Sequence, residues 1–226
     1  MDKARQMLQL QQQLNDATNG ENWEAGTTKN GKKIDWKRCI YMECAEMIDS
    51  FAWKHWKSIN QEPDWANLKI EVVDVWHFVM SLALQEYRNA ALGSIEDLAH
   101  RISQMPGYGA ISLPGVAFAT PEALMAQIEQ VMRHALRGEG FDLNGLLEEF
   151  FVLTGMSSLD LSALYRLYVG KNILNQFRQD HGYKEGNYVK IWNGEEDNVV
   201  MKRIWEKNGE LSPEALYGAL KAHYPA

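Results

Sequence analysis

The sequence has few cysteines and no long apolar run, and both absences limit what the chain can be. Among its 226 residues only Cys39 and Cys44 are cysteine. Five residues apart on one predicted helix, they suit neither a zinc site nor a structural disulfide, so reduced thiols are expected. No stretch approaches the roughly 18 apolar residues of a membrane span, and the N-terminus lacks the apolar segment of a signal peptide. We therefore expect a soluble, cytoplasmic protein with no membrane partner.

Positive charge is also scarce. Lys and Arg number 23 against 30 Asp and Glu, which leaves a formal net charge of −7. A protein that binds nucleic acid normally presents a basic patch, so stable nucleic-acid binding is disfavoured. A nucleotide enzyme is not excluded, because a bound metal ion can supply positive charge.

No segment shows the alternation of apolar and polar residues that is typical of a half-buried strand. Apolar residues instead recur with helical spacing, and Gly, Pro and Asn separate the helical stretches. The chain is therefore predicted to be an all-α helical bundle. Its helices are expected at about 1–16, 35–55, 65–91, 95–102, 120–137, 142–153, 157–180, 199–207 and 212–223.

Two acidic pairs lie within strongly apolar helical segments. Glu43 and Glu46 are three residues apart in the helix expected over 35–55, and Glu71 and Asp74 have the same spacing in the next helix. Acids three apart share a helix face. Two such helices in contact would gather four carboxylates, and buried carboxylates need compensating charge. Oxygen ligands select a hard ion, Mg²⁺ with Mn²⁺ as a substitute, so the pattern predicts a metal site between two core helices. A solvated acidic stripe is the alternative.

Two nearby features have both a functional and a structural interpretation. His77 follows Asp74 by three residues and could contact substrate or orient a carboxylate, although a core histidine with a satisfied hydrogen bond fits equally well. The Trp-Lys-His-Trp-Lys run at 53–57 could stack on a base and face phosphates. The alternative is a helix end with aromatic packing and basic residues near the C-terminal dipole.

A cluster of hydrogen-bond donors follows late in the chain. Lys171, Asn175 and Arg178 recur four and three residues apart, so one helix face would carry two cations and an amide directly after Gly170. Such donors are typical of phosphate sites, whereas the alternative is a solvated basic helix. The polar segment beyond that helix adds Tyr183, Lys184 and Lys190.

Together these residues resemble the dimeric, all-α dUTPase family, which belongs to a superfamily of all-α nucleoside triphosphate pyrophosphohydrolases. The resemblance covers the chain to about residue 90 and again from about 155 to 200. It implies a rigid catalytic core, residues 1–93 and 155–226, and an inserted variable lobe at 94–154 that could close over substrate. It is carried by both acidic pairs, the Trp-Lys-His-Trp-Lys run and the series Gly170-Lys171-Asn172, Asn175-x-x-Arg178-Gln179, Gly182-Tyr183-Lys184 and Glu196-Asp197-Asn198.

The resemblance also implies a role for each site residue. The metal ligands would be Glu43, Glu46, Glu71 and Asp74. Glu46 would also take a proton from the attacking water. Gln12 and Asn15 are similar to the residues that read uracil in this family, and His55 or Trp56 would pack on the base. The ligands of the phosphates and sugar would be Lys171, Asn175, Arg178, Tyr183, Lys184 and Lys190.

The activity that the resemblance implies is Mg²⁺-dependent hydrolysis of dUTP to dUMP and pyrophosphate by a homodimer, through attack of a metal-activated water on the α-phosphorus. Members of the family also accept dUDP. Two alternatives stay open at this point. One is a related enzyme acting on another pyrimidine deoxynucleoside triphosphate, such as dCTP. The other is a non-catalytic helical nucleotide-binding or regulatory protein whose acids form a structural ion site.

Overall fold

The computed structural model describes residues 2–57, 62–208 and 211–225. Within these ranges the only strands are β1 (Ile191–Trp192) and β2 (Glu195–Glu196), which pair as one short antiparallel hairpin. The all-α prediction is therefore confirmed, and none of the helices in these ranges combines the length and apolarity needed to cross a bilayer. The helices are α1 (Lys3–Asn19), the 3-10 helix η1 (Trp23–Ala25), α2 (Trp36–Asp49), α3 (Trp65–Asn89), α4 (Ile95–Ser103), α5 (Pro106–Ile111), α6 (Pro121–Ala135), α7 (Leu143–Met156), α8 (Leu161–Asp180), α9 (Asp197–Asn208) and α10 (Pro213–His223).

The chain divides into two compact units, one up to Tyr165 and one from Arg166 onward. Helix α8 begins in the first unit and ends in the second. The stretch 94–154, expected to be an inserted lobe, forms α4 to α7, which pack against α1, α2 and α3 inside the first unit. The motion expected of this stretch stays a prediction.

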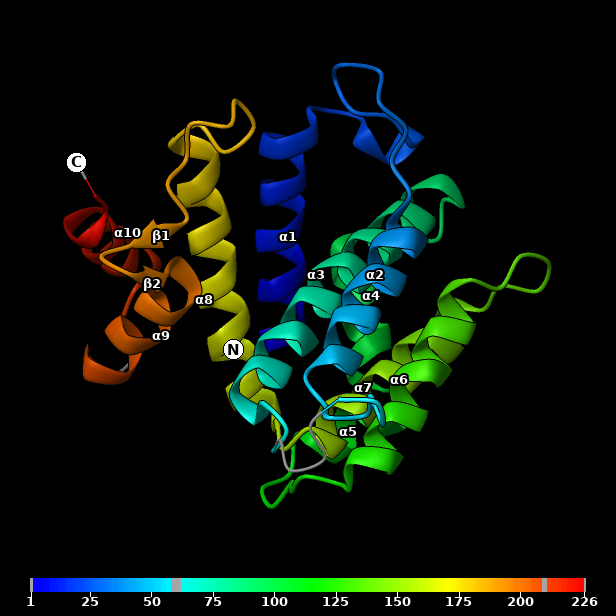
Figure 1. Cartoon of the computed structure of the whole chain (residues 1–226). Helices are drawn as coiled ribbons and strands as arrows, with labels where there is room; N and C mark the ends of the chain where they lie inside the picture. The colour runs from blue at the N-terminus through cyan, green and yellow to red at the C-terminus, as the bar shows by residue number, and fades with distance from the viewer. Residues whose placement is uncertain (1, 58–61, 209–210, 226) are drawn as a thin grey trace. The chain divides into compact units, whose positions relative to one another are not determined.

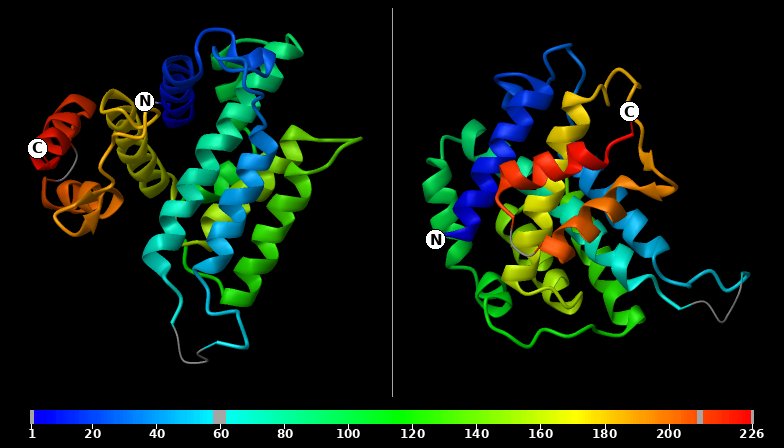
Figure 2. Two further views of the ribbon diagram at one scale, coloured as in Figure 1. Left: turned by 45° about the horizontal axis from the view of Figure 1, so that its top comes forward. Right: turned by 90° about the vertical axis from the view of Figure 1, so that its left-hand side faces the viewer.

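Helices α2 and α3 lie along each other in the first unit, with α6 against α2 and with α7 in contact with both α6 and α3 (Figures 1 and 2). Trp76 of α3 is fully buried, and its ring stacks on Phe150 of α7 with centroids 4.7 Å apart. Its indole N–H donates to Met7 Sδ of α1 at 3.4 Å. One side chain thus joins three helices. Truncating a core aromatic of this kind to alanine lowers the free energy of unfolding by about 3–5 kcal/mol.

Local sequence sets where the two acid-bearing helices begin. Asp35 and Asp64 precede α2 and α3, and each side chain accepts a hydrogen bond from the backbone N–H three residues later. Such caps satisfy N–H groups that have no partner within the helix. Thr120 caps α6 in the same way, with Pro121 in the first helical position. The helix starts predicted at about 65 and 120 are confirmed.

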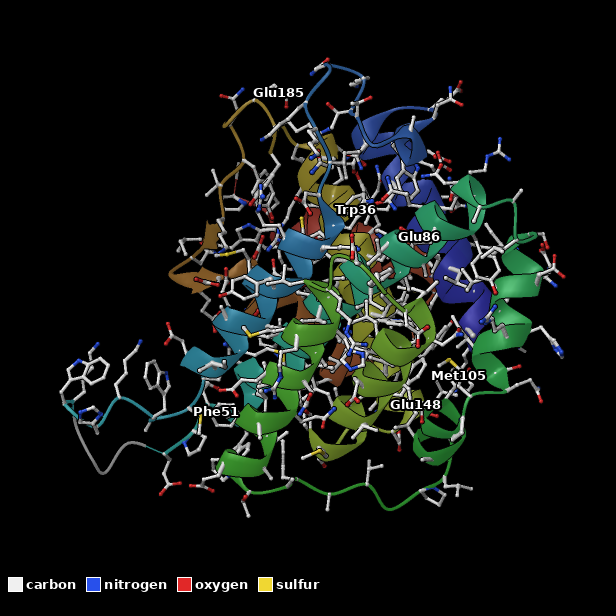
Figure 3. All side chains as sticks on the ribbon, turned by 90° about the vertical axis from the view of Figure 1, so that its right-hand side faces the viewer. Trp36, Phe51, Glu86, Met105, Glu148 and Glu185 are labelled. Carbon is white, nitrogen blue, oxygen red and sulfur yellow. The ribbon has the colours of Figure 1, made fainter. Side chains whose placement is uncertain are left out.

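The helix expected over 35–55 ends earlier, at Asp49. The Ser50 carbonyl accepts a hydrogen bond from the Asp64 N–H at 2.8 Å, which ties the exit of α2 to the start of α3. The Trp-Lys-His-Trp-Lys run therefore lies beyond α2 and is not its last turn. Figure 3 labels Trp36, the first residue of α2, and Phe51, just past its end.

A short helix, α5, forms between the helices expected at 95–102 and 120–137, where no helix was predicted. Pro106 suits the first helical position because it has no N–H to leave unpaired. The Gly107 N–H donates to the Glu148 carboxylate of α7 at 2.7 Å, and Figure 3 shows Glu148 near Met105, the residue before α5. A contact with a distant helix therefore stabilises a turn that the local Gly and Pro pattern disfavours.

The second unit is built around Phe177 of α8, whose ring is fully buried. In Figure 1 the hairpin, α9 and α10 lie together on one side of α8. The rings around Phe177 come from the polypeptide that follows α8, from β1 and from α10 and its end, so aromatic packing joins all of these segments to α8. They are His181, Tyr188, Trp192, Tyr217 and Tyr224.

Candidate active site

Helices α2 and α3 bring three carboxylates together. Glu43 and Glu46 project from α2 and Glu71 from α3, and one oxygen of each lies within 4.8 Å of the others. Apolar side chains of α2 such as Ile40 and Met47 are fully buried. Their burial fixes the rotation of α2 about its axis, and in that rotation its acids meet the acid of α3.

The arrangement of these carboxylates suits a hard divalent cation. Like charges at this separation repel unless positive charge lies between them. Each metal–oxygen distance would be about 2.1 Å, so two oxygens on one ion would be at most about 4.2 Å apart. Oxygens that lie within 4.8 Å of one another would need only small side-chain movements to hold it. An all-oxygen ligand set also selects such an ion. Glu43 and Glu71 are half-buried and Glu46 is exposed, so Glu46 is the carboxylate most open to water.

Asp74 is half-buried one turn beyond Glu71 on α3. Its carboxylate does not belong to the set of three whose oxygens meet. The two acidic pairs are therefore not equivalent, because the first contributes both of its members and the second contributes one. A ligand role for Asp74 stays a prediction.

A buried polar network joins α1 to α3. Gln11 Nε2 and Asn15 Nδ2 both donate to Ser81 Oγ, at 3.1 and 2.9 Å. Gln11 Nε2 also lies 3.2 Å from Asn15 Oδ1, and Gln11 Oε1 lies 2.7 Å from His77 Nδ1. Because a carbonyl oxygen only accepts, the His77 ring donates from Nδ1. The network thus fixes which way each amide points, and a site that reads a base by its donors and acceptors requires this.

Gln12 lies outside this network. Its Nε2 donates to Asp16 Oδ1 at 2.9 Å and to Glu24 Oε1 at 3.0 Å. The base-reading role that the resemblance implies for Gln12 stays a prediction, but the helical repeat of α1 places Gln11, and not Gln12, on its buried face. The buried residues of α1 are Ala4, Met7, Leu8, Gln11, Leu14 and Asn15.

The Trp-Lys-His-Trp-Lys run presents aromatic surface to solvent. Trp53 and Trp56 are 42% and 62% exposed, and their rings meet edge to face at 5.6 Å. His55 is also exposed, and its ring meets that of Trp56 at 5.0 Å. Exposed rings can stack on a flat ligand. Trp53 therefore joins His55 and Trp56 as a ring available for stacking.

In the second unit, the end of α8 carries the predicted phosphate donors. Asp197, the fully buried first residue of α9, accepts hydrogen bonds from Arg178 Nε at 2.8 Å and Nη2 at 2.7 Å. Arg178 Nη1 donates to Asn175 Oδ1 at 3.0 Å, and Lys171 Nζ donates to Asn198 Oδ1 at 3.0 Å. The structure thus gathers Lys171, Asn175 and Arg178 into one hydrogen-bonded group with Asp197 and Asn198.

The charges in this group are fixed by their neighbours. Burial alone would raise the pKa of the Asp197 carboxyl, but the hydrogen bonds and charge of Arg178, with a bond from the Tyr188 hydroxyl at 2.8 Å, outweigh it and hold that pKa below its ordinary value. Burial and the hydrogen bond to Asp197 raise the pKa of Tyr188. Tyr188 therefore remains a phenol that donates, and the bidentate pair holds the Arg178 guanidinium in one orientation.

The remaining predicted donors, Tyr183, Lys184 and Lys190, are exposed in the segment between α8 and β1. The centre of the Tyr183 ring lies 5.8 Å from Arg178 Cζ. Lys190 Nζ lies 3.7 Å from a Glu196 oxygen, in an ion pair whose two side chains are each about half exposed. Exposed ion pairs contribute little to stability, so Lys190 can exchange its partner for a phosphate.

Comparison with known proteins decides the family. A family model described as dUTPase matches residues 3–183, which is most of the chain. The chain belongs to the dUTPase family. Among curated proteins, no individual relative matches it significantly.

The dUTPase match includes α2 and α3 with their acids and α8 with its donors. The resemblance inferred from the motifs is thereby confirmed, and the protein is an enzyme, a dUTP diphosphatase, with a nucleotide substrate. The dUTPase match ends at Tyr183, so Lys184, Lys190 and Asp197 lie beyond it.

Proposed function

We propose that this dUTPase hydrolyses dUTP with Mg²⁺, or Mn²⁺ in its place, held by Glu43, Glu46 and Glu71 and supported by Asp74. The observation that carries the proposal is the convergence of three carboxylates from α2 and α3 within 4.8 Å. When bound, the ion would neutralise the phosphate chain and lower the pKa of a water molecule beside it. All other steps use side chains of the protein.

Glu46 is the proposed general base. It is the exposed member of the three carboxylates, so it can reach a water molecule and accept its proton as the new oxygen–phosphorus bond forms at the α-phosphorus. The bond from the α-phosphorus to the oxygen that bridges it to the β-phosphorus then breaks. Pyrophosphate departs with that oxygen, and dUMP is the other product. With dUDP, the same attack would release phosphate.

Product analysis tests this mechanism. Incubation of dUTP with the protein and Mg²⁺ is expected to yield dUMP and pyrophosphate in equal amounts, because the attack separates the α- from the β-phosphorus. Formation of dUDP and phosphate would place the attack at the γ-phosphorus and contradict the proposal.

Arg178 is the proposed principal ligand of the phosphate chain, and Lys171, Lys184 and Lys190 are proposed as further ligands. Its guanidinium is held by the buried Asp197 carboxylate at 2.7 and 2.8 Å. A donor whose orientation is fixed before substrate arrives stabilises developing negative charge without reorganising during the reaction. The hydrogen bond from Arg178 Nη1 to Asn175 Oδ1 restricts the orientation of the guanidinium further.

Base selection is assigned to Asn15 together with Gln11. Uracil and cytosine present opposite donor and acceptor patterns at N3 and at position 4, so amides held in one orientation can pair with only one of them. Gln11 and Asn15 have that property, because Ser81 and His77 hold both amides in place. His77 thereby acts by orienting Gln11.

The pair Gln11→Ala and Gln12→Ala tests the base site. Gln11→Ala is expected to reduce the preference for dUTP over dCTP by about tenfold to a hundredfold, because buried polar groups in the site lose their partner. Competition between the two triphosphates, measured by the ratio of kcat/KM, provides the readout. Gln12→Ala is the matched control and should leave the preference unchanged. If Gln12→Ala removes the preference and Gln11→Ala does not, Gln12 is the base reader.

We also infer a homodimer, as the family resemblance implies. Exposed apolar side chains on α2 and at the end of α6, among them Tyr41, Met42 and Leu136, support an interface there. Sedimentation velocity at working concentration checks the inference, and a single species with the mass of one chain, 25.9 kDa, would contradict it.

A further inference from the structure

The residue after α10, Tyr224, packs on the polypeptide that carries the proposed phosphate ligands. Its ring stacks on that of Tyr188, with centroids 5.4 Å apart and planes at 19°. Its hydroxyl accepts a hydrogen bond from the Val189 N–H at 3.0 Å. Further edge-on or tilted contacts of the same ring are those with Phe177, His181 and Trp192. One side chain from the end of the chain thus restrains consecutive residues of the segment between α8 and β1.

That segment has little regular structure of its own to hold it. Residues 187–190 lie in neither helix nor strand, and Gly182 and Gly186 adopt positive φ angles of 81° and 75°. Lys184 and Lys190, two proposed phosphate ligands, are exposed on either side of Tyr188. Backbone hydrogen bonds, such as that from the Asn187 N–H to the Gly182 carbonyl at 3.0 Å, hold the turns up to residue 187. Contacts with Tyr224 restrict the conformations of Tyr188 and Val189, which follow these turns.

Successive contacts link Tyr224 to Arg178 through Tyr188 and Asp197. The Tyr188 hydroxyl donates to Asp197 Oδ2 at 2.8 Å, and the same carboxylate accepts from Arg178 Nε at 2.8 Å. Because Tyr188 touches Tyr224 on its face and Asp197 at its hydroxyl, a displaced Tyr188 ring would remove one of the hydrogen bonds that hold Asp197. The orientation of Arg178 depends on that carboxylate.

We propose that Tyr224 is a positioning residue for phosphate binding, which orders the segment that carries Lys184 and Lys190 and, through Tyr188 and Asp197, the guanidinium of Arg178. This inference rests on the proposed function, because it takes these side chains to be the phosphate ligands. Tyr224 lies outside the range matched to the family, which ends at residue 183. Ordering the ligands before substrate arrives lowers the conformational entropy lost on binding. Loss of this order is therefore expected to weaken the affinity for the phosphate chain.

Three variants separate positioning from simple packing. Tyr224→Ala removes the stack and the hydroxyl, whereas Tyr224→Phe keeps the stack and loses only the bond to an exposed N–H. Tyr217→Ala is the matched control. Tyr217 lies within α10, is half-buried like Tyr224, and its ring also packs on Phe177, with centroids 5.3 Å apart. Its hydroxyl donates to Asp180, which is not a proposed phosphate ligand. It should therefore report any general loosening of the second unit.

The readouts are KM and kcat for dUTP, the dissociation constant of the non-hydrolysable analogue α,β-imido-dUTP with Mg²⁺, and competitive inhibition by deoxyuridine, which has no phosphate. Tyr224→Ala is expected to raise KM and to weaken analogue binding by about tenfold, with deoxyuridine inhibition near that of the wild type. Its kcat is expected to fall as well, because Arg178 is proposed to stabilise the negative charge that develops during the reaction. Tyr224→Phe and Tyr217→Ala should both bind the analogue like the wild type.

Two outcomes would overturn the inference: unchanged analogue binding in Tyr224→Ala, or an equal loss in Tyr217→Ala. A third, equal weakening of deoxyuridine and analogue binding in Tyr224→Ala, would also overturn it, because the effect would not depend on phosphate. Failure of the proposed function would appear differently, as absence of dUTP turnover in the wild type. The dissociation constants of the analogue would still allow the variants to be compared in that case.

Discussion

Replacing Glu46 by glutamine is expected to lower kcat for dUTP by about 10²- to 10⁴-fold, the range typical of losing a general base. Glutamine keeps the shape of the side chain but cannot accept a proton from water. Glu46 projects from α2 beside Glu43 and Glu71 and is the exposed member of the three. The measurement is steady-state release of dUMP at saturating dUTP and Mg²⁺.

Asp49→Asn is the matched control for this change. Asp49 lies three residues further along α2 and is exposed, but its carboxylate binds Lys54 and is outside the set of three. Both substitutions remove one negative charge from the same helix. The difference between their kcat values therefore measures the contribution of the proposed site and not that of the lost charge. Thermal unfolding should show both variants folded. Full activity in Glu46→Gln would remove Glu46 from the role of base.

Removal of divalent cations is expected to abolish turnover, and Mg²⁺ or Mn²⁺ is expected to restore it. The physical reason is the charge of three carboxylates within 4.8 Å, which a bound cation compensates. An ion that binds only the folded protein also stabilises it, by about 2.7 kcal/mol at about a hundred times its dissociation constant. The chelated protein should therefore unfold at a lower temperature than the magnesium-loaded one.

Glu71→Gln should reduce this magnesium-dependent shift in unfolding temperature, since it removes the α3 ligand. Glu86→Gln is its control, because Glu86 lies on the same helix outside the set of three and is labelled in Figure 3. The thermal readout does not depend on activity. An equal magnesium shift in Glu71→Gln and the wild type would show that these carboxylates do not hold the ion.

Much of the fold could be predicted because its signals are local. Helix starts were predicted at about 65 and 120, and Asp64 and Thr120 cap these helices in the structure. A side chain that bonds to an N–H three residues later needs no distant partner. The early end of α2 could not be predicted, because it depends on the bond between Ser50 and Asp64 across the connection. Helix α5 depends likewise on Glu148 of α7.

The candidate site could be predicted in residue type but not in detail. The spacing placed Glu71 and Asp74 on one face of α3, yet Glu71 and not Asp74 belongs to the set of three carboxylates whose oxygens lie within 4.8 Å of one another. The difference depends on the rotation of two packed helices, which the spacing within either helix does not contain. Gln11 shows the opposite case, because the apolar repeat of α1 already included it.

By itself, the sequence determined the helical class, the helix starts, the dUTPase membership and the residue types available for metal and phosphate. These follow from short-range periodicity, capping and motif spacing, which act within a few residues of the chain. Tertiary structure alone decided which acids converge and that Tyr224 reaches the segment before β1. Each of these outcomes depends on side chains from different helices, whose relative rotation and contacts arise only when the apolar faces pack.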